Sequence, residues 1–344
     1  MVKAKSARYV KKILITIFSI IGSLLILLTI SSYISEIYNP PAKNISYGVS
    51  FSPTFAEYLD LDWKKTYLAV LDDLQIKHLR IPTYWTSVEK NQGKFDFTDD
   101  DFMLEEAQKR GVKVVVVLGI KQPRWPECHV PQWAQKLSIN DRHEAALKYI
   151  KETVNRYKDN SAVYAWQIEN EPFFYPYGDC PVPDLDFFKK EVTLVKGMDK
   201  RPVIVSETGE WAPWIVQMQS SDIFGTTLYR DVYHFLTGYF TYPLTPGYYS
   251  LRSNFFRKFF APNNQKTIIV ELQAEPWFAN NSPLSTPVDR QIEIFSEEKL
   301  EANLAFAKKT GFDEIYLWGV EWWYFMKEKK GHPEYWDYVK NLFN

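Results

Sequence analysis

The run Lys113-Val-Val-Val-Val-Leu-Gly119 is a short, almost wholly apolar segment that ends at a glycine. Segments of this length and composition are typical of strands that are buried on both faces, as in a parallel sheet. Similar β-rich runs recur from about Tyr47 onward, with amphipathic stretches between them. We predict eight strands, at residues 46–51, 77–82, 113–119, 163–169, 202–206, 222–228, 267–271 and 314–319.

Apolar residues at helical spacing fill much of the chain between these strands. We predict helices at residues 62–75, 100–110, 140–158, 289–310 and 333–343. Eight strands, each followed by a helix or a long loop and with no domain linker between them, predict an α/β fold of the (β/α)8 (TIM) barrel type. A doubly wound open sheet is the alternative, but no Gly-x-Gly-x-x-Gly loop follows the first strand to support it.

The N-terminal segment predicts a transmembrane helix ahead of the barrel. No charged residue occurs from Ile13 to Ser35, and the residues before this stretch include five lysines and arginines and no acidic residue. Such a stretch can span a bilayer, and its cationic flank is expected to stay in the cytoplasm. A cleaved signal peptide, which would give a secreted protein, is the alternative. We therefore divide the chain into a cytoplasmic basic segment (1–12), a signal-anchor helix (13–35), a linker (36–45) and an extracytoplasmic barrel domain (46–344) at the cell membrane.

The overall composition excludes some classes of partner. The formal net charge is −1, so nothing indicates a nucleic acid partner. The aromatic content of 17% suits core packing and also the C–H faces of sugar rings. The chain has 5 His and no His-x-His or His-Glu-x-x-His spacing, so we expect no metal site. We also expect no cofactor, and we expect a monomer. Cys128 and Cys180, which follow the third and fourth predicted strands, are either free thiols or one disulfide.

Two of the predicted strands end in carboxylates. Glu171 lies in Trp166-Gln-Ile-Glu-Asn-Glu-Pro172, and Glu271 follows the apolar run Thr267-Ile-Ile-Val270. The active sites of such barrels lie at the carboxyl ends of their strands, so these two side chains are expected to face each other across the barrel mouth. Glycoside hydrolysis requires such a pair, with one carboxyl protonated as the acid and the other as the nucleophile or base. A spacing of about 5–5.5 Å would imply retention of configuration and about 6.5–9.5 Å inversion.

The segment Ala165-Trp-Gln-Ile-Glu-Asn-Glu-Pro-Phe173 resembles the acid/base signature of glycoside hydrolase family 5 and of its relatives in the large clan of retaining barrel glycosidases. A second stretch, Trp85-Thr-Ser-Val-Glu89 followed by Gly93-Lys-Phe-Asp-Phe97, is similar to families 5, 39 and 42. The resemblance extends from about residue 47 to residue 343. The chain departs from family 5 at Leu228, where that family often has His, and after the third strand, where Lys121 and Gln122 replace a common His.

The resemblance implies a role for six residues. Glu171 would be the acid/base and Glu271 the nucleophile that forms a glycosyl-enzyme. Asn170 would bind the sugar 2-hydroxyl, and Trp318 would form the floor of the −1 subsite. The two remaining residues, Arg80 and Tyr229, would orient the nucleophile. Three other carboxylates near strand ends compete for these roles: Glu207, Glu275 and Glu321.

These patterns leave three functional hypotheses open. The first is a retaining glycosidase that cleaves O-glycosidic bonds of a poly- or oligosaccharide. The second is a catalytically inactive, membrane-anchored carbohydrate-binding protein that kept the barrel. The third is a transglycosylase, which differs from the first only in its acceptor. The sequence indicates neither the sugar nor whether cleavage is endo or exo.

Overall fold

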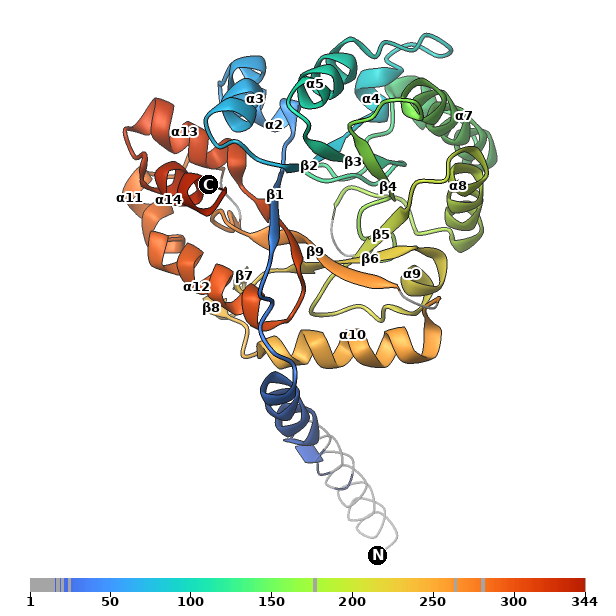
Figure 1. The fold of residues 1–344 in the computed structure, drawn as a ribbon. Helices are drawn as coiled ribbons and strands as arrows, with labels where there is room; N and C mark the ends of the chain where they lie inside the picture. The colour runs from blue at the N-terminus through green and yellow to red at the C-terminus, as the bar shows by residue number, and fades with distance from the viewer. Residues whose placement is uncertain are drawn as a thin grey trace, which may run out of the picture.

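The computed structural model describes residues 16, 19, 22–23, 26–175, 178–262, 265–279 and 282–343, and its central feature is a closed parallel barrel (Figure 1). Around the barrel each strand pairs with its neighbours in chain order, and the last strand closes onto the first. Its strands are β1 (Ser46–Ser50), β2 (His78–Pro82), β3 (Lys113–Leu118), β4 (Val163–Ile168), β5 (Val203–Glu207), β6 (Ile223–Leu228), β9 (Lys266–Gln273) and β10 (Glu314–Trp318). The predicted (β/α)8 barrel and the places of its eight strands are confirmed.

Helices surround this barrel (Figure 1). In chain order they are α2 (Pro53–Tyr58), α3 (Trp63–Asp72), α4 (Trp85–Val88), α5 (Thr98–Lys109), α6 (Gln132–Gln135), α7 (Ile139–Tyr157), α8 (Leu185–Met198), α9 (Ile215–Ser220), α10 (Pro246–Phe260), α11 (Val288–Ile294), α12 (Glu297–Lys309), α13 (Val320–Lys330) and α14 (Glu334–Phe343). Side-chain oxygens of Asp62, Ser138 and Asp184 accept from backbone N–H groups in the first turns of α3, α7 and α8. These caps satisfy donors that a helix start otherwise leaves unpaired, and so fix where the helices begin.

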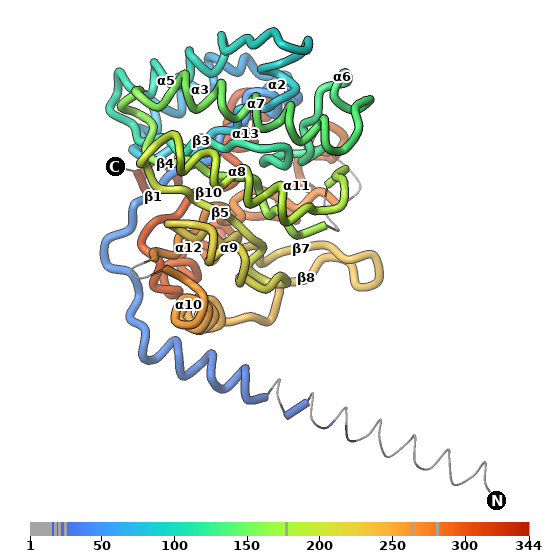
Figure 2. Tube along the Cα trace, turned by 90° about the vertical axis from the view of Figure 1, so that its right-hand side faces the viewer, coloured from blue at the N-terminus to red at the C-terminus, as the bar shows by residue number. Residues whose placement is uncertain are grey.

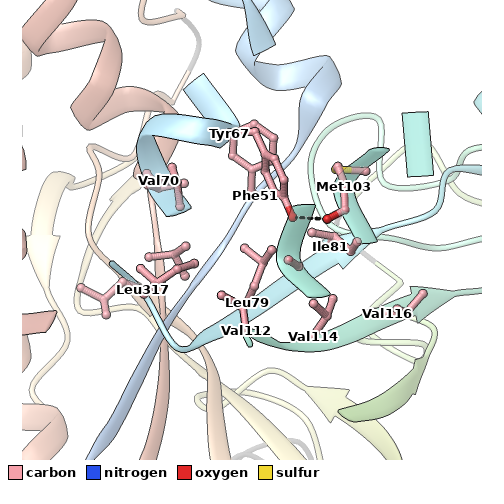
Figure 3. Close-up of a cluster of buried hydrophobic side chains, with 14 of the residues drawn as sticks. Phe51, Tyr67, Val70, Leu79, Ile81, Met103, Val112, Val114, Val116 and Leu317 are labelled. Atoms are coloured by element: carbon pink, nitrogen blue, oxygen red, sulfur yellow. Dashed lines mark hydrogen bonds between the residues drawn. The ribbon is translucent and has the colours of Figure 1, made fainter. Parts of the chain in front are cut away.

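The alternation of side chains along β3 explains why its sequence is apolar throughout. Val114 and Val116 point outward and pack against the helices, in a cluster that also contains Tyr67 and Met103 (Figure 3). Val115 belongs instead to the cluster inside the barrel. Because successive side chains of a strand point to opposite faces, a strand buried on both sides needs apolar residues at every position. The Tyr67 hydroxyl in the outer layer donates to the Met103 carbonyl at 2.6 Å, so its buried polar atom is paired.

Two details differ from the sequence-based expectation. The helix predicted at 289–310 is wrong as a single helix, since α11 ends at Ile294 and α12 begins at Glu297. Phe295 is extended between them, is fully buried, and its carbonyl accepts from the Tyr335 hydroxyl at 2.6 Å. Tertiary packing therefore overrides the helical pattern here. The second difference is an antiparallel hairpin that the sequence analysis missed, formed by β7 (Asp231–His234) and β8 (Gly238–Thr241) after β6.

The membrane helix predicted at residues 13–35 lies in large part outside the described residues. Within the described part of the chain, no helix is both long and apolar enough to cross a bilayer. Residues 26–38 are helical and pack against α10 of the barrel, where the Ser35 and Ser250 hydroxyls lie 3.3 Å apart. The anchor therefore stays a prediction.

Candidate active site

Polar side chains from several strands meet at the carboxyl ends of the barrel strands. Arg80 comes from β2, Asn170 and Glu171 follow β4, Tyr229 follows β6, and Glu271 lies in β9. Hydrogen bonds connect Arg80, Asn170, Tyr229 and Glu271 directly to one another. The structure therefore brings together five of the six residues that the sequence analysis singled out, at the end of the barrel where they were expected.

Glu271 is held by a donor on each of its two oxygens. Arg80 Nη1 donates to Oε1 at 2.9 Å, and the Tyr229 hydroxyl donates to Oε2 at 3.0 Å. The side chain is only 5% exposed. The charge-assisted bond from the guanidinium and the second hydrogen bond together fix the orientation of the carboxyl group.

Arg80 organises the floor of the site. It is fully buried, and its guanidinium donates to four acceptors, which lie in β1, β4, β9 and the loop after β4. Besides Glu271, these are Gln167 Oε1 at 2.8 Å, Asn170 Oδ1 at 2.7 Å and Ser50 Oγ at 3.3 Å. A buried arginine is stable only when its charge and its donors are paired in this way. The bond to Asn170 Oδ1 also fixes the orientation of the Asn170 side chain.

Glu171 occupies a contrasting environment. Burial raises the pKa of Glu171 well above its ordinary value, and the negative charge of Glu271 raises it further. Its Oε1 accepts from Thr227 Oγ1 at 3.0 Å, and Lys121 Nζ donates to its backbone carbonyl rather than to its carboxyl. The backbone of Glu171 has a φ of 47°, which is uncommon for a residue with a side chain. Such backbone strain is concentrated at functional sites, where the surrounding contacts hold it in place.

The strand register explains how the two carboxyls come together. Thr227 of β6 pairs with Glu271 of β9, and the Thr227 hydroxyl donates to Glu171. Thr227 thus lies beside Glu271 in the sheet and contacts the carboxyl group of Glu171. Glu271 is the strongest of the charges that raise the pKa of Glu171, as expected for two acids that share one buried centre.

A third carboxyl, Glu127, lies at the same centre and was missed by the sequence analysis. It is buried, and burial raises its pKa to about 8. Asn170 Nδ2 lies 3.5 Å from its Oε2. Next to it, Cys128 forms a disulfide with Cys180, which joins the loops after β3 and β4 and settles the question that the sequence left open. The adjacent cysteine was the only sequence signal that could have drawn attention to Glu127.

Trp318, the sixth predicted residue, ends β10 and is 8% exposed. The guanidinium of Arg124 lies 4.0 Å from the centre of its ring. Arg124 forms a buried cluster with Glu275 and Glu321, and it lies 2.7 Å from the Glu321 carboxylate. One face of the Trp318 ring is therefore covered by a paired cation. The predicted contact of Trp318 with a sugar stays a prediction.

The three competing carboxylates have partners that explain their burial. Glu275 and Glu321 share Arg124, and Glu321 also accepts from the Ser52 backbone N–H at 2.5 Å. Glu207, at the end of β5, accepts from the Thr208 backbone N–H at 3.0 Å, and burial raises its pKa to about 7. Among the described residues, the hydrogen bonds of Glu271 to both an arginine and a tyrosine have no counterpart at these three carboxyls.

Parts of this sequence are similar to those of known proteins. Residues 82–178 match the model of Glycosyl hydrolase family 10, a segment that includes Glu171 and ends before Glu271. Mannan endo-1,4-beta-mannosidase A of Emericella nidulans is 23% identical over 157 residues, which cover 43% of this chain and 40% of that protein. The chain thus spans less than half of the length of this relative.

Solved structures share the fold at low sequence identity. A GH5_18 protein of Bifidobacterium longum in complex with Manb1-4GlcNAc superposes with a TM-score of 0.58 at 12% identity, covering 80% of this chain and 69% of the other. Xylanase 10B of Thermotoga petrophila in complex with xylobiose gives a TM-score of 0.54 at 15% identity, covering 80% and 82%. The matched segment, the relative and the closed barrel all fit the (β/α)8 glycoside hydrolases, and they fit an enzyme of the glycosidase class. The family model that matches is that of family 10, and GH5_18 proteins of family 5, one of the families that the motifs resemble, are among the structures that share the fold.

Proposed function

We propose that this protein is a retaining glycoside hydrolase, with Glu171 as the acid/base and Glu271 as the nucleophile. The observation that carries the proposal is that two carboxyls at one buried centre have different surroundings. Glu171 is buried, no arginine or lysine of the described residues bonds its carboxyl, and its pKa is raised. Glu271 accepts from Arg80 and Tyr229. A buried carboxyl with a raised pKa beside a second carboxyl that hydrogen bonds hold in place is the arrangement that acid catalysis beside a nucleophile requires.

The reaction proceeds in two displacements. Glu271 attacks the anomeric carbon while Glu171 donates its proton to the glycosidic oxygen, so that the alcohol leaves and a glycosyl-enzyme ester forms. Glu171, now a carboxylate, then takes a proton from a water that attacks the same carbon. This second step releases the sugar with its original configuration and returns both carboxyls to their starting states.

Three further side chains would bind the sugar. Asn170, which Arg80 orients, would contact the 2-hydroxyl, where hydrogen bonds strengthen in the transition state. Glu127 lies beside Asn170, and its raised pKa makes it largely neutral at pH 7, so that it can donate as well as accept. Trp318, whose ring contacts Arg124 on one face, would pack against the sugar ring. The relatives named above act on mannan or hold xylobiose and Manb1-4GlcNAc, so we propose a β-linked glycan as the substrate class.

We also propose that residues 13–35 anchor the enzyme in the cell membrane and that the barrel lies outside the cytoplasm. The uncharged stretch with lysines and arginines on one side supports this orientation. The Cys128–Cys180 disulfide supports it independently, because disulfides persist mainly in oxidising compartments.

The catalytic roles are tested with a panel of aryl β-glycosides, including mannosides, galactosides and xylosides. We expect the wild type to hydrolyse at least one of them, and Glu271→Ala and Glu171→Ala to lose activity. Azide should restore the reaction of Glu271→Ala with formation of an α-glycosyl azide, whereas Glu171→Ala should give the β-azide. The exposed Glu301→Ala of α12 is the matched control and should behave as the wild type. Intact activity in Glu271→Ala contradicts the assignment. Glycan binding without hydrolysis by the wild type would favour a non-catalytic carbohydrate-binding protein.

A further inference from the structure

The carboxyl group of Glu127 lies at the candidate catalytic centre but takes no part in the two displacements proposed above. Glu127 belongs to the loop between β3 and α6. In Figure 2, α6 lies at the same end of the barrel as the β7–β8 hairpin, so this loop forms part of the barrel mouth. Burial has the largest effect on the pKa of Glu127, and the charges of Glu271 and Arg80 also act on it. A buried acid that lies in a catalytic cleft and is not used in the reaction is a candidate for substrate recognition.

The backbone around Glu127 is fixed in an uncommon conformation. Glu127 has a φ of 69°, in the left-handed region that residues with a side chain rarely adopt. Its carbonyl accepts from the Gln122 N–H at 2.7 Å, and its own N–H donates to the Arg124 carbonyl at 2.8 Å. The disulfide of Cys128 ties the next residue to the loop after β4, which comes so close that a Cβ on Gly178 would lie 2.7 Å from the Cβ of Glu127. Such contacts hold a side chain in one place, as a binding group requires.

The carboxyl group of Glu127 has no ion pair with any lysine or arginine of the described residues. Asn170 Nδ2 lies 3.5 Å from its Oε2, which is longer than an ordinary hydrogen bond. Lys121 Nζ donates instead to two backbone carbonyls of the loop after β4. Arg80 donates to Gln167, Ser50, Glu271 and Asn170. Glu127 therefore lacks the counter-ion that a buried carboxyl needs in order to ionise.

The centre as a whole has more acids than bases. Burial has the largest effect on the pKa of Glu171, and three other carboxyls raise it further through their charges: Glu271, Glu207 and Glu127. The cations that oppose these effects at Glu127 and Glu171 are Lys121 and Arg80. With four carboxyls and two cations, this part of the described chain attracts a positively charged ligand and repels a carboxylate or a phosphate. A metal ion fits poorly, since no group of three or more His, Cys, Asp or Glu among the described residues could hold one.

Arg80 determines which part of a sugar lies beside Glu127. Its guanidinium bonds both Glu271 and Asn170, so Asn170 lies next to the proposed nucleophile. Since Glu271 would attack the anomeric carbon, Asn170 and Glu127 would face the substituent on the neighbouring carbon, C2. A hydroxyl at C2 can accept from Asn170 Nδ2 and needs no charged partner. An ammonium group at C2 offers three donors and a positive charge, and it would supply the missing counter-ion.

We propose that Glu127 determines specificity and that the sugar cleaved at this centre carries a free amino group at C2, as in a 2-amino-2-deoxy-β-glycoside. The inference rests on the proposed function and names the substrate class of that site. The ammonium group pairs with the Glu127 carboxylate in a buried, charge-assisted hydrogen bond. A 2-hydroxyl and an N-acetylated amine both lack the charge, so the same contact separates amino sugars from both.

Binding is measured apart from hydrolysis, by calorimetry with phenyl thio-β-glycosides, whose sulfur-linked bond is cleaved slowly. Glucose, mannose and galactose are each compared as the 2-hydroxy, 2-amino-2-deoxy and 2-acetamido-2-deoxy compound. For at least one of these sugars, the wild type should bind the amino compound about ten- to hundredfold more tightly than the other two, as expected for a hydrogen bond between charged groups. Glu127→Gln keeps the size of the side chain, removes its charge and should abolish this preference. Glu301→Ala, on the exposed face of α12, is the matched control and should keep it.

Three results would overturn the inference. These are equal or weaker binding of the amino compound for all three sugars, tightest binding of the acetamido compound, and an undiminished preference in Glu127→Gln. The wild-type comparison decides the question even where Glu127→Gln does not fold. The matching oxygen-linked aryl glycosides test the proposed function separately. If the wild type hydrolyses none of them, the proposed function fails, and the binding preference still decides whether Glu127 recognises an amine.

Discussion

Replacing Glu171 by glutamine tests whether the raised pKa of this side chain serves catalysis. The change keeps the size of the side chain and a group that can accept from Thr227, but removes the proton that the leaving oxygen needs. General acid catalysis contributes roughly 10²–10⁴-fold to the rate. Since each tenfold change corresponds to about 1.4 kcal/mol of barrier, the variant should lose about 3–5 kcal/mol of transition-state stabilisation.

The loss should depend on the leaving group. For an unactivated alkyl glycoside, kcat/KM of Glu171→Gln should fall by about 10²–10⁴, whereas a dinitrophenyl glycoside, whose leaving group needs no proton, should be affected little in the first step. The matched control is Glu207→Gln, another buried carboxyl at a strand end. Its effect should be the same for both leaving groups. An equal loss on both substrates in Glu171→Gln would refute the acid role.

The pH dependence follows from the same pKa. Because Glu171 must be protonated to act, kcat/KM of the wild type should fall as pH rises through the raised folded-state pKa, and this limb should disappear in the variant. The folding stability should also fall as pH rises through this pKa. A carboxyl whose folded pKa lies above its unfolded value of about 4.3 contributes stability at low pH, which is lost as pH rises through the folded pKa. Denaturant titrations should therefore show that Glu171→Gln gains stability over the wild type toward alkaline pH. An identical slope in both proteins would contradict this reasoning.

Three further predictions concern the support of the site. Arg80→Met should cost about 3–5 kcal/mol of unfolding free energy, since it leaves a buried carboxylate unpaired; a denaturation midpoint close to the wild-type value contradicts this. Replacing Cys128 and Cys180 by serine removes a link across 52 residues, which the loop-closure relation places at about 4 kcal/mol, and KM should rise with little change in kcat. An unchanged thermal midpoint would count against that account. Gly247→Val should displace the 26–38 helix and speed proteolysis of residues 36–45 in vesicles, because its Cβ would overlap the Ser32 carbonyl. Protection equal to the wild type contradicts the packing described.

The barrel was predictable because its strands follow a simple rule. A strand buried on both faces must be apolar at every position, and the runs around Val115 and Ile268 satisfy this without any knowledge of their neighbours. The break at Phe295 was not predictable, because it depends on burial of that ring and on the distant Tyr335 hydroxyl. The β7–β8 hairpin was missed since its two strands are short and its turn lacks an Asn-Gly or Asp-Gly signal.

The site was predictable only for residues that lie near the ends of predictable strands. Glu171 lies just past the end of β4 and Glu271 near the end of β9, and the register of the barrel then brings them together. Glu127 lies in an irregular loop after β3, and a disulfide and a hydrogen bond from Asn170 position it. Such long-range contacts leave no periodic trace in the sequence. The same reason explains why the covering of Trp318 by Arg124 became visible only in the structure.

The central claim is that Glu271 forms a covalent bond with the sugar, and trapping this intermediate tests it most directly. A 2-deoxy-2-fluoro glycoside with a dinitrophenyl leaving group, of the sugar that the enzyme prefers, forms the glycosyl-enzyme faster than water can release it. Digestion and mass spectrometry should then find the added mass of one fluorosugar on the peptide that contains Glu271. A label on any other carboxyl, or an unlabelled enzyme that releases product of inverted configuration, would contradict the account.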